Sequence, residues 1–121
     1  MTVNKRHLLV KSYLGKMLTV KIDRPIGYIH KKENYSLTYP INYGYIPGVL
    51  GGDGEELDVY LLGVDTPAKE YTARIIGIVR RCNDVEDKLV AAPEGLNFTV
   101  EEIMEAVKFQ EQYYDSEIEI L

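Results

Sequence analysis

The chain has 121 residues, an apolar content of 45% and a formal net charge of −5. This length allows one domain with a single core, which we expect to span residues 1–121. The acidic balance argues against a nucleic-acid partner, which would need Lys and Arg gathered on one face. A single Cys82 excludes an internal disulfide and fits a reducing compartment, and we expect its side chain to be half-buried.

No apolar run is long enough to span a bilayer, and the N-terminus lacks the apolar core of a signal peptide. We therefore expect a cytoplasmic protein without a membrane partner. Residues 7–10 form a short apolar run with basic neighbours, and whether this segment docks on the domain or on a partner is left open.

Alternating apolar and polar residues predict a first strand over Met17–Ile22, ended by Asp23, Arg24 and Pro25. Residues 27–37 are polar. Further strands are predicted over Leu57–Val64, Tyr71–Arg80 and Lys88–Ala92. Short strands separated by turns favour a mainly β fold, a small closed five-stranded OB-like barrel.

One helix is predicted near the C-terminus. Thr99 and Glu102 have the spacing of a capping box, which begins a helix. The apolar residues that follow recur at helical spacing, so this helix should pack on the barrel. We place on or beside its apolar face Val100, Ile103, Met104, Ala106, Val107, Phe109, Tyr113 and Tyr114.

The stretch Tyr39–Asp58 carries the chemistry. Asp53, Glu55 and Asp58 fall within one Gly-rich turn that leads into an apolar strand. Carboxylates this close repel one another, and a hard divalent cation such as Mg²⁺ is the usual compensation. Tyrosine hydroxyls upstream can donate to phosphate oxygens.

This stretch resembles the signature of the family I soluble inorganic pyrophosphatases. Tyr39-Pro-Ile-Asn-Tyr-Gly-Tyr-Ile-Pro47 matches a family segment that leads into Asp-Gly-Asp-Pro-x-Asp, here Asp53-Gly-Glu-Glu-Leu-Asp58. The middle Asp is therefore Glu55 and the Pro is Glu56. The resemblance extends to Asp23, Lys88 and Tyr113, although the chain is shorter than the usual family member.

The resemblance implies a fold of the inorganic pyrophosphatase type and two or more Mg²⁺ ions, with Mn²⁺ as an alternative. Asp53, Asp58 and Glu86 would bind the first ion, and Asp58 would bridge to the second. Asp84 and Glu86 match a second acidic turn of the family, with Asp87 as a substitute. Asp23 stands where the family has a metal-site Glu before Pro.

For the reaction, the resemblance implies that Glu55 is the general base and that Tyr43 lies beside the nucleophile. The residues implied to bind phosphate are Lys31, Tyr39, Lys88 and Tyr113, and Glu33 would anchor cations or waters on the phosphate side. Two differences from the family pattern remove positive charges from this set of phosphate contacts. Tyr114 replaces a family Lys, and Tyr39 follows too soon for a family hairpin whose Arg clamps phosphate. Arg24, Lys31 or Lys32 would have to substitute for that Arg.

The expected function is Mg²⁺-dependent hydrolysis of inorganic pyrophosphate to two phosphates, by attack of a metal-bridging water. Glu55 is one methylene longer than the family Asp, and a displacement of about 1 Å can lower a rate on the order of 100-fold, so a slow enzyme is expected. The alternatives are a hydrolase of another small phosphoanhydride or phosphoester with the same metal site, and a weakly active phosphate- or pyrophosphate-binding domain. The partner is thus a small-molecule substrate, and a homo-oligomer is left open.

Overall fold

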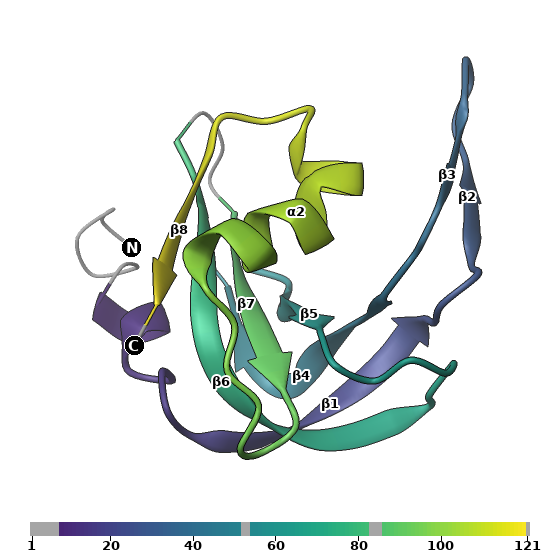
Figure 1. The fold of residues 1–121 in the computed structure, drawn as a ribbon. Coiled ribbons are helices and arrows are strands. Elements are labelled where there is room, and N and C mark those ends of the chain that lie inside the picture. Colours follow the sequence, from purple (N-terminus) through teal and green to yellow (C-terminus); the bar gives the residue numbers. More distant parts are fainter. Residues whose placement is uncertain (1–7, 52–53, 83–85, 121) are drawn as a thin grey trace.

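The computed structural model describes residues 8–51, 54–82 and 86–120. They form a mainly β fold with a C-terminal helix (Figure 1). The elements are β1 (Met17–Arg24), β2 (Ile29–Lys31), β3 (Ser36–Thr38), β4 (Asn42–Leu50), β5 (Glu56–Leu61), β6 (Glu70–Arg81), β7 (Asp87–Ala92), α2 (Val100–Glu111) and β8 (Ser116–Ile120). Residues 8–11 form a helical turn before β1. No helix in these ranges is both long and apolar enough to cross a membrane.

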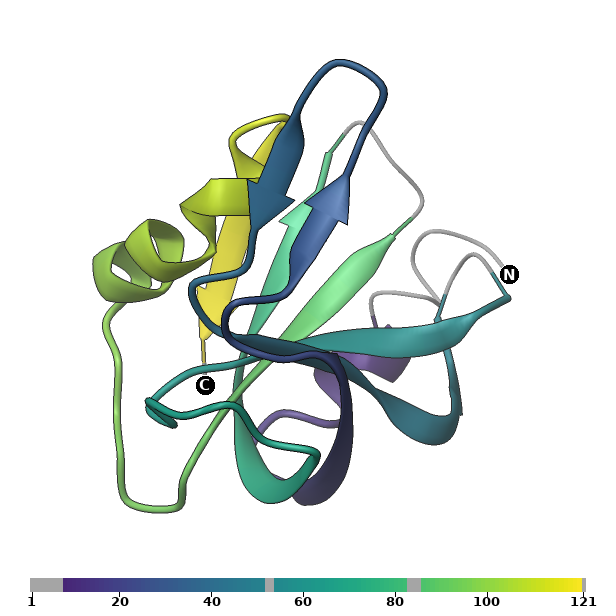
Figure 2. The same cartoon turned by 90° about the vertical axis from the view of Figure 1, so that its right-hand side faces the viewer.

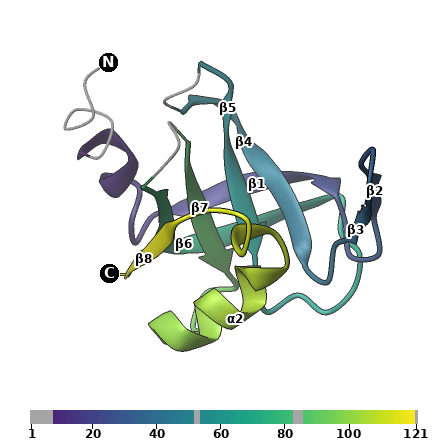
Figure 3. The same cartoon turned by 90° about the horizontal axis from the view of Figure 1, so that it is seen from above.

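Five strands close into a barrel, which confirms the predicted fold. Their order is β1-β4-β5-β7-β6, and β1 also pairs with the first part of β6. Only the β5–β7 pair is parallel among the barrel pairs of the described residues. β8 pairs with the last part of β6 and extends the sheet there. Viewed from above, α2 covers one side of this barrel (Figure 3).

Side chains of alternating strand positions fill two apolar clusters on opposite faces of the barrel wall. The first cluster contains Val59, Ile78 and Leu89, and the N-terminal helical turn adds Val10 to it. In the second cluster, the side chains on the other face of the strands pack against the inner face of α2. Its buried members are Tyr39, Tyr43, Tyr60, Leu62, Val79, Val90, Ile103 and Val107. The tyrosines of the central stretch therefore belong to the layer between the barrel wall and the helix.

A β-hairpin is present just before Tyr39, so the expectation that Tyr39 follows too soon for a hairpin is wrong. β2 and β3 pair over three residues each, and the Lys32 N–H donates to the carbonyl of Tyr35 across the turn. The hairpin projects away from the barrel (Figures 1 and 2). Its sequence from Ile29 to Thr38 contains His and Lys but no Arg.

The four predicted strands correspond to β1, β5, β6 and β7, whereas β4 and β8 were not predicted. Two details differ from the prediction, the end of β5 and the exposure of Cys82. β5 ends at Leu61 rather than at Val64. Asn42, fully buried, donates from Nδ2 to the carbonyls of Val64 (3.3 Å) and Thr66 (3.0 Å), and so turns the chain away from the sheet. Cys82 directly follows β6 and is exposed, not half-buried.

The predicted capping box is confirmed, because Thr99 Oγ1 accepts from the Glu102 N–H while Glu102 accepts from the Thr99 N–H. The predicted extent of the apolar face is wrong at its end. α2 stops at Glu111, so Tyr113 and Tyr114 lie beyond the helix and are exposed.

A buried ion pair fastens the last turn of α2 to the barrel. Arg81, at the end of β6, donates to both oxygens of Glu111 at 3.0 and 2.8 Å. Tyr60 and Ser116 also donate to Glu111, at 2.5 and 2.7 Å. Burial favours a higher pKa for Glu111, but these hydrogen bonds, first that of Arg81, outweigh it and hold the pKa below its ordinary value.

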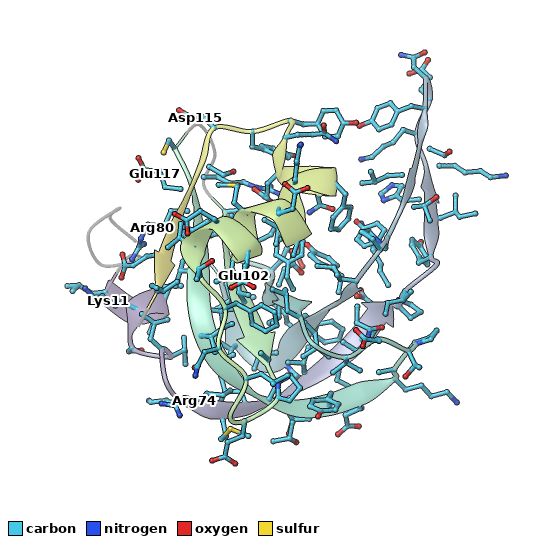
Figure 4. The ribbon with its side chains drawn as sticks, viewed as in Figure 1. Lys11, Arg74, Arg80, Glu102, Asp115 and Glu117 are labelled. Atoms are coloured by element: carbon cyan, nitrogen blue, oxygen red, sulfur yellow. The ribbon has the colours of Figure 1, made fainter. Side chains whose placement is uncertain are left out.

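A second charged group lies on the side of the molecule away from the hairpin, where Figure 4 labels Lys11 and Arg80. Arg80 contacts Glu119 at 3.0 Å and Asp87 at 3.6 Å, and Lys11 contacts Glu119 at 3.6 Å. Asp87 therefore faces Arg80, on the opposite face of β7 from Lys88, because adjacent residues of a strand point to opposite faces.

We predict that Glu111→Gln lowers the free energy of unfolding by about 3 kcal/mol, because it leaves the buried Arg81 without its bidentate partner. The lowered pKa of Glu111 means that its stabilisation is present above the ordinary Glu value of about 4.3 and is lost as the pH falls through the folded-state pKa. The difference between wild type and variant should therefore shrink below about pH 4. Urea titrations across pH measure it, with the exposed Glu105→Gln as a control expected within about 0.5 kcal/mol of wild type. Equal stability of the Glu111 variant and wild type at pH 7 would contradict this role.

Candidate active site

A cavity of about 240 Å³ opens between the β2–β3 hairpin, the barrel wall and the end of α2. It is lined by Arg24, His30, Lys32, Tyr35, Leu37, Tyr39, Tyr43, Asp58, Arg81, Glu86, Lys88, Gln110, Tyr113 and Tyr114. We call it the site cavity. Its lining comes from the seven strands β1 to β7, from segments beside them and from the end of α2, so the closed barrel and the docked helix are both needed to form it.

Lys88 lies at the centre of this lining with its side chain only 3% exposed. Its Nζ donates to Asp58 Oδ2 at 2.8 Å and to the Tyr43 hydroxyl at 2.7 Å, and lies 3.3 Å from Glu86 Oε2. Burial favours a lower pKa for Lys88, but Tyr43 and Asp58 outweigh burial and raise the pKa above its ordinary value. The ammonium is therefore charged at neutral pH, and it holds carboxylates of β5 and of the segment before β7 together.

Arg24 enters the cavity from the end of β1. A bulge at Asp23 shifts the register of β1 against β4, so that Arg24 stands opposite Tyr43. Gly44 allows this close crossing, since a Cβ there would lie 1.8 Å from the Lys21 carbonyl oxygen. The Arg24 guanidinium donates to the Tyr39 hydroxyl at 2.5 Å, which fixes both side chains at the foot of the hairpin.

Tyr39 also links the hairpin side of the cavity to α2. Its hydroxyl donates to Gln110 Oε1 at 2.6 Å, and Gln110 Nε2 donates to the Tyr60 hydroxyl at 2.9 Å. Burial raises the pKa of Tyr39, even though Arg24 acts to lower it. The hydroxyl therefore stays protonated near neutral pH and remains a hydrogen-bond donor.

Arg81 closes the helix end of the cavity. Besides its bond to Glu111, it donates from Nη1 to Glu86 Oε2 at 3.0 Å. Its guanidinium carbon lies 3.6 Å from the centre of the Tyr114 ring, a close cation–π contact. Glu86 is thus shared between two cations, Arg81 and Lys88.

The charges around the cavity favour an anion. Four cationic side chains line it, Arg24, Lys32, Arg81 and Lys88, against two carboxylates, Asp58 and Glu86. His30 adds an Nδ1 that is buried and has no hydrogen-bond partner among the described residues. The molecule as a whole carries −5, so these cations invert the sign locally.

The structure brings together six of the site residues expected from the sequence: Tyr39, Tyr43, Asp58, Glu86, Lys88 and Tyr113 all line the cavity. Three described candidates, Asp23, Lys31 and Glu55, are not among the lining residues. Asp53 and Asp84 lie outside the described residues. Of the three cations considered as replacements for the missing Arg, the lining includes Arg24 and Lys32.

Asp23 nevertheless interacts with the cavity. Desolvation raises the pKa of Asp23, and the negative charge of Asp58 adds to the rise, against the opposing effect of Arg24. A carboxylate whose ionisation is opposed by a neighbouring carboxylate lies where a cation would be stabilised. Within the described ranges no three acidic, His or Cys side chains are grouped closely enough to hold a metal ion. The oxygen donors Asp58 and Glu86, which already share the cation of Lys88, fit a hard divalent cation in chemical kind.

The sequence did not single out Arg81, Gln110 or Glu111. Arg81 ends an apolar strand and resembles a solvated turn residue, while Gln110 and Glu111 look like ordinary polar positions of an amphipathic helix. One signal was available, because Glu111 falls four residues after Val107 and eight after Ile103 and thus on the buried face. A charge at that position needs a buried partner.

Comparison with known proteins identifies the family. The family model for inorganic pyrophosphatase matches residues 15–119. An inorganic pyrophosphatase of Saccharolobus solfataricus is 44% identical over 80 residues, which cover 63% of this chain and 42% of that protein. One from Rickettsia typhi is 30% identical over 92 residues, 70% of this chain and 52% of that protein. The chain thus spans about half the length of these relatives.

Solved structures agree on the fold. The inorganic pyrophosphatase from Ehrlichia chaffeensis matches with a TM-score of 0.64 at 21% identity, covering 88% of this chain and 87% of that one. The enzyme from Neisseria gonorrhoeae matches with a TM-score of 0.59 at 24% identity, covering 82% and 74%. The family match over residues 15–119 and the shared barrel lead to one conclusion: this chain belongs to the inorganic pyrophosphatase family.

Proposed function

We propose that this chain hydrolyses inorganic pyrophosphate to two phosphates at the site cavity, with Mg²⁺ as cofactor. The observation that carries the proposal is the buried Lys88 ammonium, held by Asp58, Glu86 and Tyr43 on the floor of a cavity with three further cationic side chains. A small, highly charged anion fits such a lining, and family membership supports pyrophosphate as that anion.

The metal would be held by carboxylates, of which Asp58 and Glu86 line the site cavity while Asp53 and Asp84 lie outside the described residues. We assign Asp53, Asp58, Asp84 and Glu86 as ligands, with Asp23 as a further candidate beside Asp58. When bound, Mg²⁺ supplies neutralisation of phosphate oxygens and activation of the attacking water. Mn²⁺ has similar ligand preferences and would serve as a substitute.

The substrate would be oriented by the cations and hydroxyls of the lining. Lys88 and Arg24 approach it from the floor, and the Tyr113 hydroxyl can donate its hydrogen to a phosphate oxygen. Tyr39 can do the same when its hydrogen bond to Gln110 is exchanged for one to the substrate. Arg24 offers several N–H donors in a fixed plane, so it is a better replacement for a phosphate-clamping Arg than a lysine would be. Lys31 stays a more distant candidate, since it is not among the lining residues.

Removal of a proton from the attacking water is assigned to Glu55 on the basis of its place in the family motif, since Glu55 is not among the residues that line the cavity. This residue follows the Gly-rich turn and precedes β5, and its backbone carbonyl accepts from the Gly51 N–H at 2.8 Å. Tyr43 is unsuited to act as the base, because burial raises its pKa above the ordinary tyrosine value despite the opposing charge of Lys88. Tyr43 instead keeps its proton and orients Lys88 and the water.

The first test is phosphate release from pyrophosphate with Mg²⁺ and with EDTA, for wild type and Asp58→Asn. We expect Mg²⁺-dependent release by wild type and loss of release by the variant, since Asn removes the charge while keeping the shape. Calorimetry should show loss of Mg²⁺ binding as well. Asp65→Asn, in the exposed turn after β5, is the matched control and should behave as wild type. Unchanged Mg²⁺ affinity in Asp58→Asn, or no release by wild type, would contradict the proposal.

A second prediction concerns Lys88. Lys88→Met removes the ammonium but keeps most of the side-chain volume, so KM for pyrophosphate should rise about 10- to 100-fold, the range for loss of a charge-assisted hydrogen bond. Steady-state kinetics with Mg²⁺ measure it, and Lys108→Met on the exposed face of α2 is the control. A KM equal to that of wild type would remove Lys88 from the substrate site.

A third prediction separates proton removal from metal binding. Glu55→Gln should abolish turnover while Mg²⁺ affinity stays nearly intact, because Glu55 is not assigned as a ligand. Glu55→Asp shows whether the turn has adapted to the longer arm: a slower variant means that it has, and a faster one means that the native base is misplaced. Full activity in Glu55→Gln would show that another group is the base.

A further inference from the structure

Three exposed tyrosines form an aromatic rim around the mouth of the site cavity: Tyr35, Tyr113 and Tyr114. They are 46%, 55% and 39% exposed. Tyr35 is in the turn of the β2–β3 hairpin, and the other two follow the end of α2. The rings of Tyr35 and Tyr113 lie 5.6 Å apart at an angle of 32°, so that the rim joins the two sides of the mouth.

The rim does not belong to the core. None of its members is part of either apolar cluster. Single exposed aromatic residues are ordinary on a protein surface, but three at one cavity mouth present ring surface that a flat ligand can contact. Inorganic pyrophosphate has only charged oxygens and no apolar face, so it makes no use of exposed ring surface.

The rim lies beside groups suited to a diphosphate. Arg24, Lys32 and Lys88 line the same cavity, and the Arg81 guanidinium covers one face of the Tyr114 ring at 3.6 Å. That contact limits the ring to few orientations and leaves it partly exposed. The buried Nδ1 of His30, without a hydrogen-bond partner among the described residues, adds a polar contact point within the lining. The cationic side chains on the cavity floor suit a diphosphate, and the aromatic rings at its mouth suit a planar ring. The cavity therefore suits a molecule with a diphosphate at one end and a planar ring at the other.

We propose that the site also accepts nucleoside diphosphates, with the base against the aromatic rim and the diphosphate on the cationic floor. This inference rests on the proposed function, because it uses the same phosphate site. Stacking on an aromatic side chain suits any base, since every base has a flat π-face. The aliphatic surface of the lining is limited to Leu37, which disfavours a long hydrocarbon group.

The reaction on such a substrate follows the proposed one. The oxygen of water forms a bond to the terminal phosphorus, and the bond between that phosphorus and the bridging oxygen breaks. The bridging oxygen leaves with its electron pair on the nucleoside monophosphate, and the water proton passes to Glu55 and then to solvent. The products are phosphate and nucleoside monophosphate, and no oxidant or further reactant is needed.

Equilibrium binding of three non-hydrolysable ligands in the presence of Mg²⁺ tests the inference. The ligands are methylenediphosphonate, the α,β-methylene analogue of ribose 5-diphosphate and the α,β-methylene analogue of ADP. The last two have the same charged ends and differ in the adenine. We expect the ADP analogue to bind about 10-fold more tightly than the ribose analogue, as stacking of one base provides.

Tyr35→Leu is the informative variant, because Tyr35 has no assigned part in binding the phosphates. This variant should bind the ADP analogue no more tightly than the ribose analogue, and its affinity for methylenediphosphonate should equal that of wild type. Tyr13→Leu, a tyrosine outside the cavity lining, is the control and should change none of the three affinities. The inference would be overturned if wild type bound the ADP analogue no more tightly than the ribose analogue. It would also be overturned if Tyr35→Leu lowered the affinity for all three ligands equally, because the rim would then only stabilise the structure of the cavity.

The two proposals fail in different ways. If methylenediphosphonate does not bind and pyrophosphate is not hydrolysed, the proposed function is wrong, and the inference that rests on it is overturned with it. If methylenediphosphonate binds but adenine adds nothing, pyrophosphate hydrolysis stands and the nucleotide inference alone is overturned.

Discussion

The buried ammonium of Lys88 is the interaction on which the site depends. Asp58 comes from β5 and Glu86 from the segment before β7, and their repulsion is relieved because one cation lies within 2.8 and 3.3 Å of them. The parallel pairing of β5 with β7 places these residues side by side. A fully buried cation is stable only with such partners, so the position of Lys88 and the position of the carboxylates require one another.

The rest of the fold keeps that arrangement in place from two directions. On the helix side, the Arg81–Glu111 pair fastens the end of α2 to β6, and Arg81 reaches on to Glu86. On the hairpin side, the bulge in β1 aims Arg24 at Tyr39, whose hydroxyl continues to Gln110 of α2. The cavity is therefore lined by side chains whose positions are fixed by hydrogen bonds to one another, and a ligand would exchange some of these bonds, such as that between Lys88 and Asp58, for bonds to itself.

Much of the fold could be predicted because the relevant signals are local. Strand periodicity predicted four of the five barrel strands, β1, β5, β6 and β7, to within a few residues, but neither β4 nor β8. The Thr99–Glu102 spacing located the start of α2. The end of β5 was missed because it depends on Asn42, whose four hydrogen bonds connect segments distant in sequence. The hairpin was missed because its strands are only three residues long and too short to show a period.

The site was predicted in part, for a similar reason. Tyr39, Tyr43 and Asp58 lie within one stretch whose composition is unusual in itself. Arg81 and Gln110 take part in the cavity through partners in other elements, and no local pattern distinguishes them from solvated residues. Lys31 and Lys32 are neighbours in sequence, and only the hairpin geometry shows that Lys32 is the one that lines the cavity.

The most direct test of the central claim is a crystal structure of the protein with Mg²⁺ and imidodiphosphate, a non-hydrolysable analogue of pyrophosphate. We expect the analogue on the floor of the site cavity, within hydrogen-bond distance of Lys88 Nζ and the Arg24 guanidinium, with Mg²⁺ on an oxygen of Asp58. Density for the analogue elsewhere on the molecule, with the bond between Lys88 and Asp58 unchanged and no ion beside Asp58, would contradict it.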